Sequence, residues 1–328
     1  TPMVNRPFSE PRAPGSTFKM ITATAGLQEG IISPNTGIYD KGTFKDAGRP
    51  YARCWIGSGS GSHGNVNVSE ALEVSCNYFF YTVAYRMNKG AGDLSGINTL
   101  NKYMEAFGLN SPTGVEISEL YDSMSQYPTH ISSPEYKKYI TQQRDADAKE
   151  SDYKWSAGDT IRTAIGQSYN NYTSALMSKY VATLANGGTR YSMHFLNKIT
   201  NNDGKTEEEY QPKVESKIEI KKENLDAIFK GMFLVTTGPR GTLRNYFKDF
   251  PVDVAAKSGT AQQSSKRSEH TTFVAFAPLE DPQISVCVII PFGNGTTGPA
   301  PKVAKVAISE YLKLDYKPEL KSYDTLLH

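Results

Sequence analysis

Three short motifs stand in one order along this chain and together carry the side chains of serine-based acyl chemistry: Ser16-Thr17-Phe18-Lys19, Ser75-Cys76-Asn77 and Lys257-Ser258-Gly259-Thr260. A free serine hydroxyl is a weak nucleophile and needs a base beside it. A lysine amine can be that base only when it is neutral, which burial or a second nearby cation favours. The three motifs therefore predict an enzyme that forms a covalent serine ester.

The first two motifs supply distinct groups for such a reaction. Lys19 follows Ser16 by about one helical turn, so both lie on one face of a helix predicted to start with Ser16 as its N-cap. We assign Ser16 as the nucleophile and Lys19 as its base, with Lys257 as the cation that lowers the pKa of Lys19. Ser75 would relay protons and Asn77 would hold a substrate amide, which requires the chain to reverse at this motif.

The third motif follows an apolar run, residues 252–256, that predicts a strand. Because Gly259 has no side chain, a substrate peptide can lie against this strand as an added strand. The hydroxyls of Ser258 and Thr260 are suited to bind a carboxylate. The backbone N–H groups of Ser16 and Thr260 are candidate donors to the oxyanion that forms during acyl transfer.

Two further segments match these patterns, so each motif alone is a weak signal. Ser151 and Lys154 have the spacing of the first motif, and Ser168 and Asn170 have that of the second. Ser16 follows the breaker pair Pro14-Gly15 and has the other two motifs downstream. This context selects Ser16 as the nucleophile.

The composition limits the class of protein. The chain has 328 residues, enough for one large domain or two smaller ones with a substantial core. Its net charge of +2 gives no field that favours nucleic acid. No apolar run approaches the roughly eighteen residues of a membrane span, and no signal peptide is evident. We expect no nucleic-acid partner, and membrane contact only through a segment outside this chain.

Helical periodicity in the first two thirds of the chain gives way to strand signals near its end. Apolar spacing predicts helices over residues 16–30, 70–87, 97–107, 173–186, 225–235 and 303–311, the second capped by Ser69. Strands are predicted over residues 252–260, 271–277 and 284–290, the last two as a hairpin. Residues 118–160 are polar and predict a long segment on the surface. This order predicts an α+β fold, with an antiparallel sheet sandwiched by helices.

Further landmarks extend a family resemblance over nearly the whole chain: Asn5-Arg6-Pro7, Ala164-Ile165-Gly166-Gln167-Ser168, Ala185-Asn186-Gly187-Gly188 and Thr271-Thr272-Phe273-Val274-Ala275-Phe276-Ala277-Pro278. With them, the chain resembles the transpeptidase domain of a class B penicillin-binding protein, in details an elongation-type member from low-GC Gram-positive bacteria. The resemblance implies the fold shared by serine β-lactamases and D,D-transpeptidases. It also implies that residues 1–328 are one transpeptidase domain, with the family's membrane anchor and N-terminal pedestal domain outside this chain.

The resemblance implies a membrane-anchored enzyme on the outer face of the cytoplasmic membrane that cross-links peptidoglycan and serves cell shape. Ser16 would attack the carbonyl between two terminal D-alanines of a stem peptide and expel the last one. An amine of a neighbouring stem peptide would then take the acyl group. β-Lactam antibiotics would acylate Ser16 and stay. A cell-wall synthesis complex with a glycosyltransferase would be the partner, since no glycosyltransferase segment is present here.

Three related activities share these motifs and are kept as alternatives. A D,D-carboxypeptidase forms the same acyl-enzyme and uses water as the acceptor. A β-lactam-sensing domain is acylated once and signals. A serine β-lactamase needs a base that activates water for deacylation, and no glutamate between Asn77 and Lys257 can be placed in that role by motif.

Two cysteines and a histidine lie in and before the second motif. Cys54 and His63 precede Cys76, and Asp46 precedes all three. Two thiolates, one imidazole and one carboxylate form a ligand set for tetrahedral zinc, so we predict a structural Zn²⁺ site from Asp46, Cys54, His63 and Cys76. The intervening segment is rich in glycine and serine, and a metal would stabilise it. Cys287 lies in a predicted apolar strand and is expected in the core.

Other states of these residues are compatible with the sequence. An extracytoplasmic protein could join Cys54 to Cys76 as a disulfide. Both could also be buried free thiols that only fill space. Asp46 is the weakest of the four ligands, and Glu70, Glu73 or a water molecule could take its place.

Overall fold

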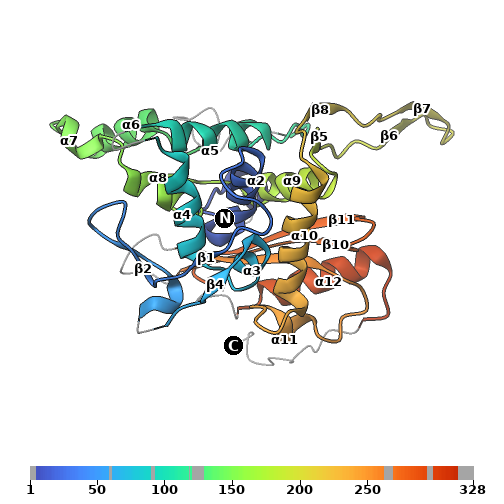
Figure 1. Ribbon diagram of the computed structural model, residues 1–328. Coiled ribbons are helices and arrows are strands. Elements are labelled where there is room, and N and C mark those ends of the chain that lie inside the picture. Colours follow the sequence, from blue (N-terminus) through green and yellow to red (C-terminus); the bar gives the residue numbers. More distant parts are fainter. Residues whose placement is uncertain are drawn as a thin grey trace, which may run out of the picture.

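The computed structural model describes residues 5–58, 61–89, 93–117, 119, 129–261, 269–293 and 298–316. In Figure 1, a three-stranded antiparallel sheet lies between a large group of helices and the C-terminal helix. Its strands are β9 (Ala255–Ala261), β10 (His270–Ala277) and β11 (Ile284–Ile290), in the order β11-β10-β9. The predicted α+β fold, with helices on both faces of an antiparallel sheet, is confirmed.

The central strand β10 separates two hydrophobic cores, because successive side chains of a strand point to opposite faces. Phe273 and Ala275 pack with apolar residues of the C-terminal helix α12 (Ala300–Leu312). Val274 and Phe276 belong to the larger core, which the other helices form. All of β10 is buried, and this fixes the position of its neighbour β9, which carries the third motif.

Helix α2 (Lys19–Gln28) occupies the centre of the helical group. Its residues from Lys19 to Leu27 are all buried, so it has no solvent-facing stripe. The helices around it are α3 (Val68–Glu73), α4 (Asn77–Met87), α5 (Ser95–Ala106), α8 (Ala157–Thr163), α9 (Ser174–Ala185) and α10 (Lys222–Thr237). The first motif therefore stands at the start of the most enclosed helix of the fold.

Smaller elements complete the described part of the chain. The remaining helices are α1 (Arg6–Ser9), η1 (Gly15–Phe18), η2 (Trp55–Ser58), α6 (Pro134–Arg144), α7 (Glu150–Tyr153) and α11 (Arg244–Phe247). Two-stranded ribbons pair β1 (Ile38–Tyr39) with β4 (Asn65–Val66), β2 (Thr43–Phe44) with β3 (Ala52–Arg53), β5 (Thr189–Tyr191) with β8 (Val214–Lys217), and β6 (Lys198–Thr200) with β7 (Thr206–Glu209). The first two ribbons lie beside α3 and α4 (Figure 1).

The prediction of one helix over residues 70–87 is wrong. The chain forms α3, breaks at residues 74–76 and resumes as α4. Asn67, not Ser69, caps α3: its side chain accepts from the backbone of Glu70, and the Glu70 carboxylate accepts from the Asn67 N–H. Ser69 is already inside the helix, where its hydroxyl donates to the carbonyl of Ala227 at 2.7 Å.

The polar segment 118–160 is partly helical. It contains α6, α7 and the start of α8, and α6 has no buried residue. Residues 118 and 120–128 of the predicted surface segment lie outside the described residues. In the part of the chain that the structure covers, no helix has both the length and the apolar character needed to cross a membrane.

Candidate active site

Ser16 lies inside the 3₁₀ turn η1, immediately before α2. Pro14 occupies the N-cap of this turn, and no side-chain cap bond is made there, so the prediction of Ser16 as a helix N-cap is wrong. Gly15 has φ 56, in the left-handed region that glycine adopts readily. Its N–H donates to the carbonyl of Gly166 at 3.0 Å. This bond ties the turn to the segment after α8.

Strand β9 approaches the Ser16 turn so closely that glycine is needed on both sides. A Cβ atom on Gly259 would lie 2.7 Å from the Pro14 carbonyl oxygen and 3.0 Å from the Ser16 nitrogen. A Cβ on Gly15 would lie 2.4 Å from the Thr260 oxygen. We predicted that Gly259 makes room for a substrate peptide; in the structure it makes room for the nucleophile's own turn. The first and third motifs are thereby brought together.

The second motif reverses the chain, as its role requires. Ser75 has φ 54, which a side chain seldom adopts and which costs about 1 kcal/mol or more. The Cys76 N–H donates to the Ala71 carbonyl at 2.8 Å and stabilises this turn. Cys76 is then the N-cap of α4, and its sulfur accepts from the Phe79 N–H at 3.4 Å. The turn directs Ser75 and Asn77 to Lys19.

Two buried lysines converge on the hydroxyl of Ser75. Lys19 Nζ lies 3.1 Å and Lys257 Nζ lies 3.0 Å from Ser75 Oγ. Lys19 also donates to Asn77 Oδ1 at 2.7 Å, and Lys257 to the Ser258 carbonyl at 2.9 Å. Both lysines are 0% exposed. The three motifs thus form one continuous hydrogen-bonded group.

Burial changes the protonation of both lysines, because it disfavours the charged form. It lowers the pKa of Lys19 to about 8, and the negative charges of Cys54 and Cys76 partly oppose this. Burial and the nearby charge of Lys19 lower the pKa of Lys257 well below its usual range. A neutral lysine amine is therefore accessible close to physiological pH, as a lysine base requires.

The rate of Ser16 acylation is expected to follow the deprotonation of Lys19. Below a pKa of about 8, the neutral fraction rises about tenfold per pH unit, so the rate should rise similarly and level off above about pH 8. The measurement is the second-order rate constant for acylation by a penicillin between about pH 6 and about pH 9.5. A flat profile through about pH 8 would contradict the role of Lys19 as the base.

A cavity of about 400 Å³ opens at these motifs. Its walls are Ser16, Trp55, Ser75, Asn77, Ile165, Gln167, Thr242, Ser258, Gly259, Thr260 and Glu269. Sequence reasoning assigned no site role to Trp55, Thr242 or Glu269, and it marked Ile165 and Gln167 only as parts of a landmark. Trp55 directly follows Cys54, and its indole N–H donates to the Ser75 carbonyl at 3.1 Å.

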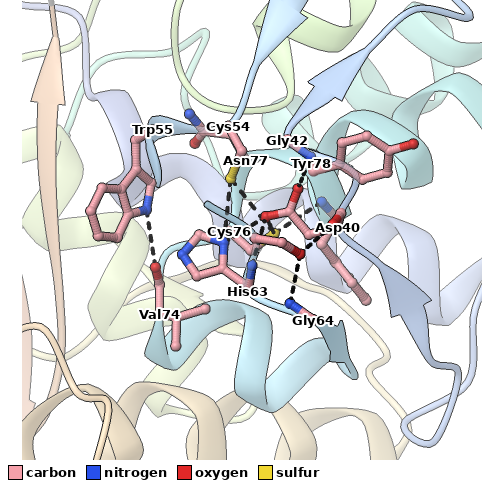
Figure 2. A network of polar contacts seen from close by, with 12 residues as sticks. Asp40, Gly42, Cys54, Trp55, His63, Gly64, Val74, Cys76, Asn77 and Tyr78 are labelled. Carbon is pink, nitrogen blue, oxygen red and sulfur yellow. Dashed lines mark hydrogen bonds and ion pairs between the residues drawn. The ribbon is translucent and has the colours of Figure 1, made fainter. Parts of the chain in front are cut away.

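Next to this cavity, four potential metal ligands point toward one another (Figure 2). They are Asp40, Cys54, His63 and Cys76, whose ligand atoms all lie within 4.8 Å of one another. The predicted fourth ligand, Asp46, is wrong: it is exposed in the β2–β3 turn. The β1–β4 ribbon brings Asp40 to His63 instead, because the Asp40 N–H donates to the Gly64 carbonyl at 2.9 Å.

The spacing of these atoms resembles that of a tetrahedral site, in which bonds of about 2.0–2.3 Å separate ligand atoms by about 3.3–3.8 Å. Cys54 Sγ lies 3.4 Å from His63 Nδ1 and 3.9 Å from Cys76 Sγ, and Cys76 Sγ lies 3.5 Å from Asp40 Oδ2. His63 Nδ1 and Asp40 Oδ2 are closer, at 2.7 Å. The cysteines are free thiols in the structure, so they are not joined as a disulfide.

Hydrogen bonds within the cluster favour the thiolate of Cys54 and the protonated form of His63, and they raise the pKa of the Cys76 thiol. Hydrogen bonding from Cys76 lowers the pKa of Cys54 to about 5. Burial opposes protonation of His63, but hydrogen bonds to Asp40 and Cys54 raise its pKa to about 9. Glu70, named as an alternative ligand, belongs to the cap of α3, and Glu73 bonds to Arg240. Neither is in the cluster.

The two segments that match the motif patterns by spacing alone, at Ser151 and Ser168, lie outside the cavity wall. Ser151 is exposed on α7, and Ser168 has φ 65 in the turn after α8. Cys287 lies on β11 and packs against the larger core, at intermediate exposure. The single lysine of α9, Lys179, is buried but is paired with Glu215 at 2.8 Å. Of these groups, none lines the cavity.

Comparisons with known proteins agree with this geometry. A family profile described as "Penicillin binding protein transpeptidase domain" matches residues 1–308. The chain is 33% identical over 315 residues to the Escherichia coli K12 protein named peptidoglycan D,D-transpeptidase MrdA, covering 92% of this chain and 45% of that protein. The chain therefore spans about half the length of this curated relative.

Solved structures share the fold of this chain. Pseudomonas aeruginosa PBP2, in complex with WCK 5153, matches with a TM-score of 0.76 and 28% identity, covering 98% of this chain and 65% of that one. A second chain, from work on coordination of polymerization and crosslinking by a peptidoglycan synthase complex, matches with a TM-score of 0.77 and 25% identity. The match covers 97% of this chain and 49% of that one.

Proposed function

We propose, from the premise that this chain belongs to the penicillin-binding protein transpeptidase domains, that it is a serine D,D-transpeptidase of peptidoglycan. One observation carries the proposal: Lys19 and Lys257 both contact Ser75 Oγ at the cavity that contains Ser16. This arrangement supplies a nucleophile, a buried amine with a lowered pKa and a hydroxyl that can pass a proton between them. The name of the relative, a D,D-transpeptidase, supports the same reaction.

The proposed reaction has two acyl transfers. Ser16 Oγ attacks the carbonyl carbon between the terminal D-alanines of a donor stem peptide, and its proton passes to neutral Lys19. The C–N bond breaks, and the departing D-alanine amine receives a proton through Ser75. The amine of an acceptor stem peptide then attacks the Ser16 ester and forms the cross-linking amide, and Ser16 recovers its proton. A β-lactam would form the same ester, but its amine stays tethered to the acyl group.

We also propose where and with what the enzyme works. As a cross-linker of peptidoglycan, it would act on the outer face of the cytoplasmic membrane, held there by a segment outside this chain. Its ligands would be stem peptides and β-lactam antibiotics. A glycosyltransferase in a cell-wall synthesis complex would be its partner, which the similarity to a chain of a peptidoglycan synthase complex supports.

We propose a structural Zn²⁺ ion as the ligand of the Asp40, Cys54, His63 and Cys76 cluster. The donor set suits zinc, and three of the four residues are buried, so their charged forms need a partner. When bound, the metal would neutralise the thiolates and fix the short β1–β4 ribbon. Cys76 lies between Ser75 and Asn77, so the cluster supports the turn of the second motif directly.

The transpeptidase proposal is tested by following the acyl group from donor to acceptor. A thioester analogue of a D-Ala-D-Ala stem peptide is incubated with the protein and a D-amino acid, and the products are separated by mass. We expect a Ser16 ester and a new amide with the D-amino acid. Hydrolysis of the donor without amide formation would instead identify a carboxypeptidase.

Two other outcomes would also contradict the proposal. Rapid turnover of a penicillin, with no lasting adduct, would identify a β-lactamase. A permanent penicillin adduct in a protein that never transfers an acyl group from the peptide donor would identify a sensing domain. The donor assay and the penicillin-adduct measurement together separate all four activities that share the three motifs.

A further inference from the structure

The turn of residues 238–242 after α10 brings a hydroxyl into the cavity that none of the three motifs contains. Thr242 lines the cavity together with Ser258 and Thr260. Its Oγ1 lies 3.5 Å from Ser258 Oγ. Two hydroxyls from separate parts of the chain, those of Thr242 and Ser258, therefore face the same end of the cleft.

This turn is folded tightly back on the end of α10. The Gly238 N–H donates to the Leu234 carbonyl at 2.8 Å, and the Leu243 N–H donates to the Val235 carbonyl at 3.0 Å. A Cβ atom on Gly241 would lie 2.4 Å from the Leu234 oxygen. The position of Thr242 thus depends on the exact path of residues 238–241.

Glu73 holds the opposite side of this turn. Its side chain is 4% exposed, and Oε1 accepts from the Arg240 backbone N–H at 2.9 Å. Oε2 lies 3.8 Å from the Arg240 guanidinium. A Cβ atom on Gly238 would lie only 2.3 Å from Glu73 Oε1. A buried carboxylate is costly without partners, so the folded position of Glu73 and the path of the turn stabilise each other.

The same carboxylate is close to the second motif in sequence. Glu73 is the last residue of α3, two residues before Ser75. Arg240 also donates to the His63 carbonyl at 3.4 Å, so the turn contacts the segment that carries a metal ligand. Glu73 therefore links the placement of Thr242 to elements that already position the reacting groups.

We propose that Thr242 is a specificity residue that binds the terminal carboxylate of the donor, and that Glu73 is the positioning residue that holds Thr242 there. This inference rests on the proposed D,D-transpeptidase function, whose donor ends in a free carboxylate. Hydroxyls donate to carboxylates, and Thr242 and Ser258 place two hydroxyls side by side at this end of the cleft.

The acidic group of the cavity lies at the other end of the strand. Glu269 precedes His270, which pairs with Ala261 in the sheet. Ala261 is three residues beyond Ser258, or about 10 Å at the rise of a strand. The Thr242 end of the cleft is therefore the end suited to an anion.

The test compares benzylpenicillin with its methyl ester, which lacks the carboxylate. Acylation of Ser16 is followed by intact mass over a range of concentrations, which separates the dissociation constant from the acylation rate constant. We expect Thr242→Val to weaken binding of the acid about tenfold or more, with little change for the ester. Thr242→Ser keeps the hydroxyl and should retain the affinity of the unmodified protein.

Glu73 is tested through its coupling to Thr242. Glu73→Ala should reproduce the selective loss for the acid, and the double variant Glu73→Ala/Thr242→Val should show no further loss. Glu73→Gln keeps an acceptor for the Arg240 N–H and should retain most of the affinity. If Glu73→Ala does not fold, Gly238→Ala replaces it. Gly238 has φ −64, and a Cβ there would lie 2.3 Å from Glu73 Oε1 and 2.7 Å from the Leu234 carbonyl oxygen, so this variant displaces Glu73 and the start of the turn together.

Three results would overturn this inference. An equal loss of affinity for the acid and for the ester would show that Thr242 does not bind the carboxylate. Independent, multiplying losses in the double variant would show that Glu73 does not act through Thr242. Full affinity in both Glu73→Ala and Gly238→Ala would remove the positioning role. By contrast, absence of any Ser16 adduct in the unmodified protein would overturn the proposed function itself.

Discussion

Replacing Ser16 by alanine is expected to abolish covalent labelling by a fluorescent penicillin. The unmodified protein should gain one stable adduct per chain, because Ser16 lines the cavity together with Ser75, whose hydroxyl contacts two buried lysines. Without the hydroxyl no ester can form, so labelling should fall by at least about a thousandfold. The measurement is intact mass after incubation, with fluorescence as a second readout.

Ser151 offers a matched control, because it is followed by a lysine at the same spacing as Ser16. It is exposed on α7. Ser151→Ala should therefore leave the adduct unchanged in amount and in rate. Equal labelling of the Ser16→Ala protein and the unmodified protein would place the nucleophile elsewhere and reject the assignment.

Removal of metal from the Asp40, Cys54, His63 and Cys76 cluster is expected to destabilise the protein strongly. A ligand that binds only the folded state at far above its dissociation constant contributes about 4 kcal/mol, which for a chain of this size corresponds to a melting shift of about 5 °C or more. We expect one zinc per chain in the purified protein. A chelator should lower the melting temperature and slow acylation, because Cys76 lies in the second motif.

Single cysteine variants separate this effect from general damage. Cys54→Ala should lose the zinc and melt at the lower temperature even without chelator. Cys287→Ala removes a thiol that lies outside the cluster, so its zinc content and its response to chelator should match those of the unmodified protein. A protein that contains no zinc, and melts identically with and without chelator, would contradict the metal proposal.

The sheet and the three motifs could be predicted because their signals are local. β10 is buried on both faces and reads as an apolar run, and the Ser16, Ser75 and Lys257 motifs are defined by spacing. The break between α3 and α4 could not be predicted in this way. Apolar positions such as Leu72 and Phe79 continue on both sides of it, and only the left-handed backbone of Ser75 marks the turn.

The parts of the site that sequence reasoning missed depend on contacts between distant segments. Asp40 replaces Asp46 as the fourth ligand because Ile38 pairs with Val66, and no local pattern shows that register. Thr242 reaches the cavity through a turn whose path depends on Glu73, far earlier in the chain. Trp55 could have been noticed as the neighbour of Cys54, but its place in the cavity wall depends on the fold.

The glycine contacts around Ser16 affect how this site can change under selection by antibiotics. A side chain at position 15 or 259 would meet backbone of the facing segment, and one at Gly166 would lie 2.1 Å from the Gly15 oxygen. Backbone cannot move aside as a side chain can, so substitutions of these three glycines would displace the turn that carries Ser16. Escape from a drug is therefore expected at cavity residues outside these glycine contacts, such as the exposed Trp55.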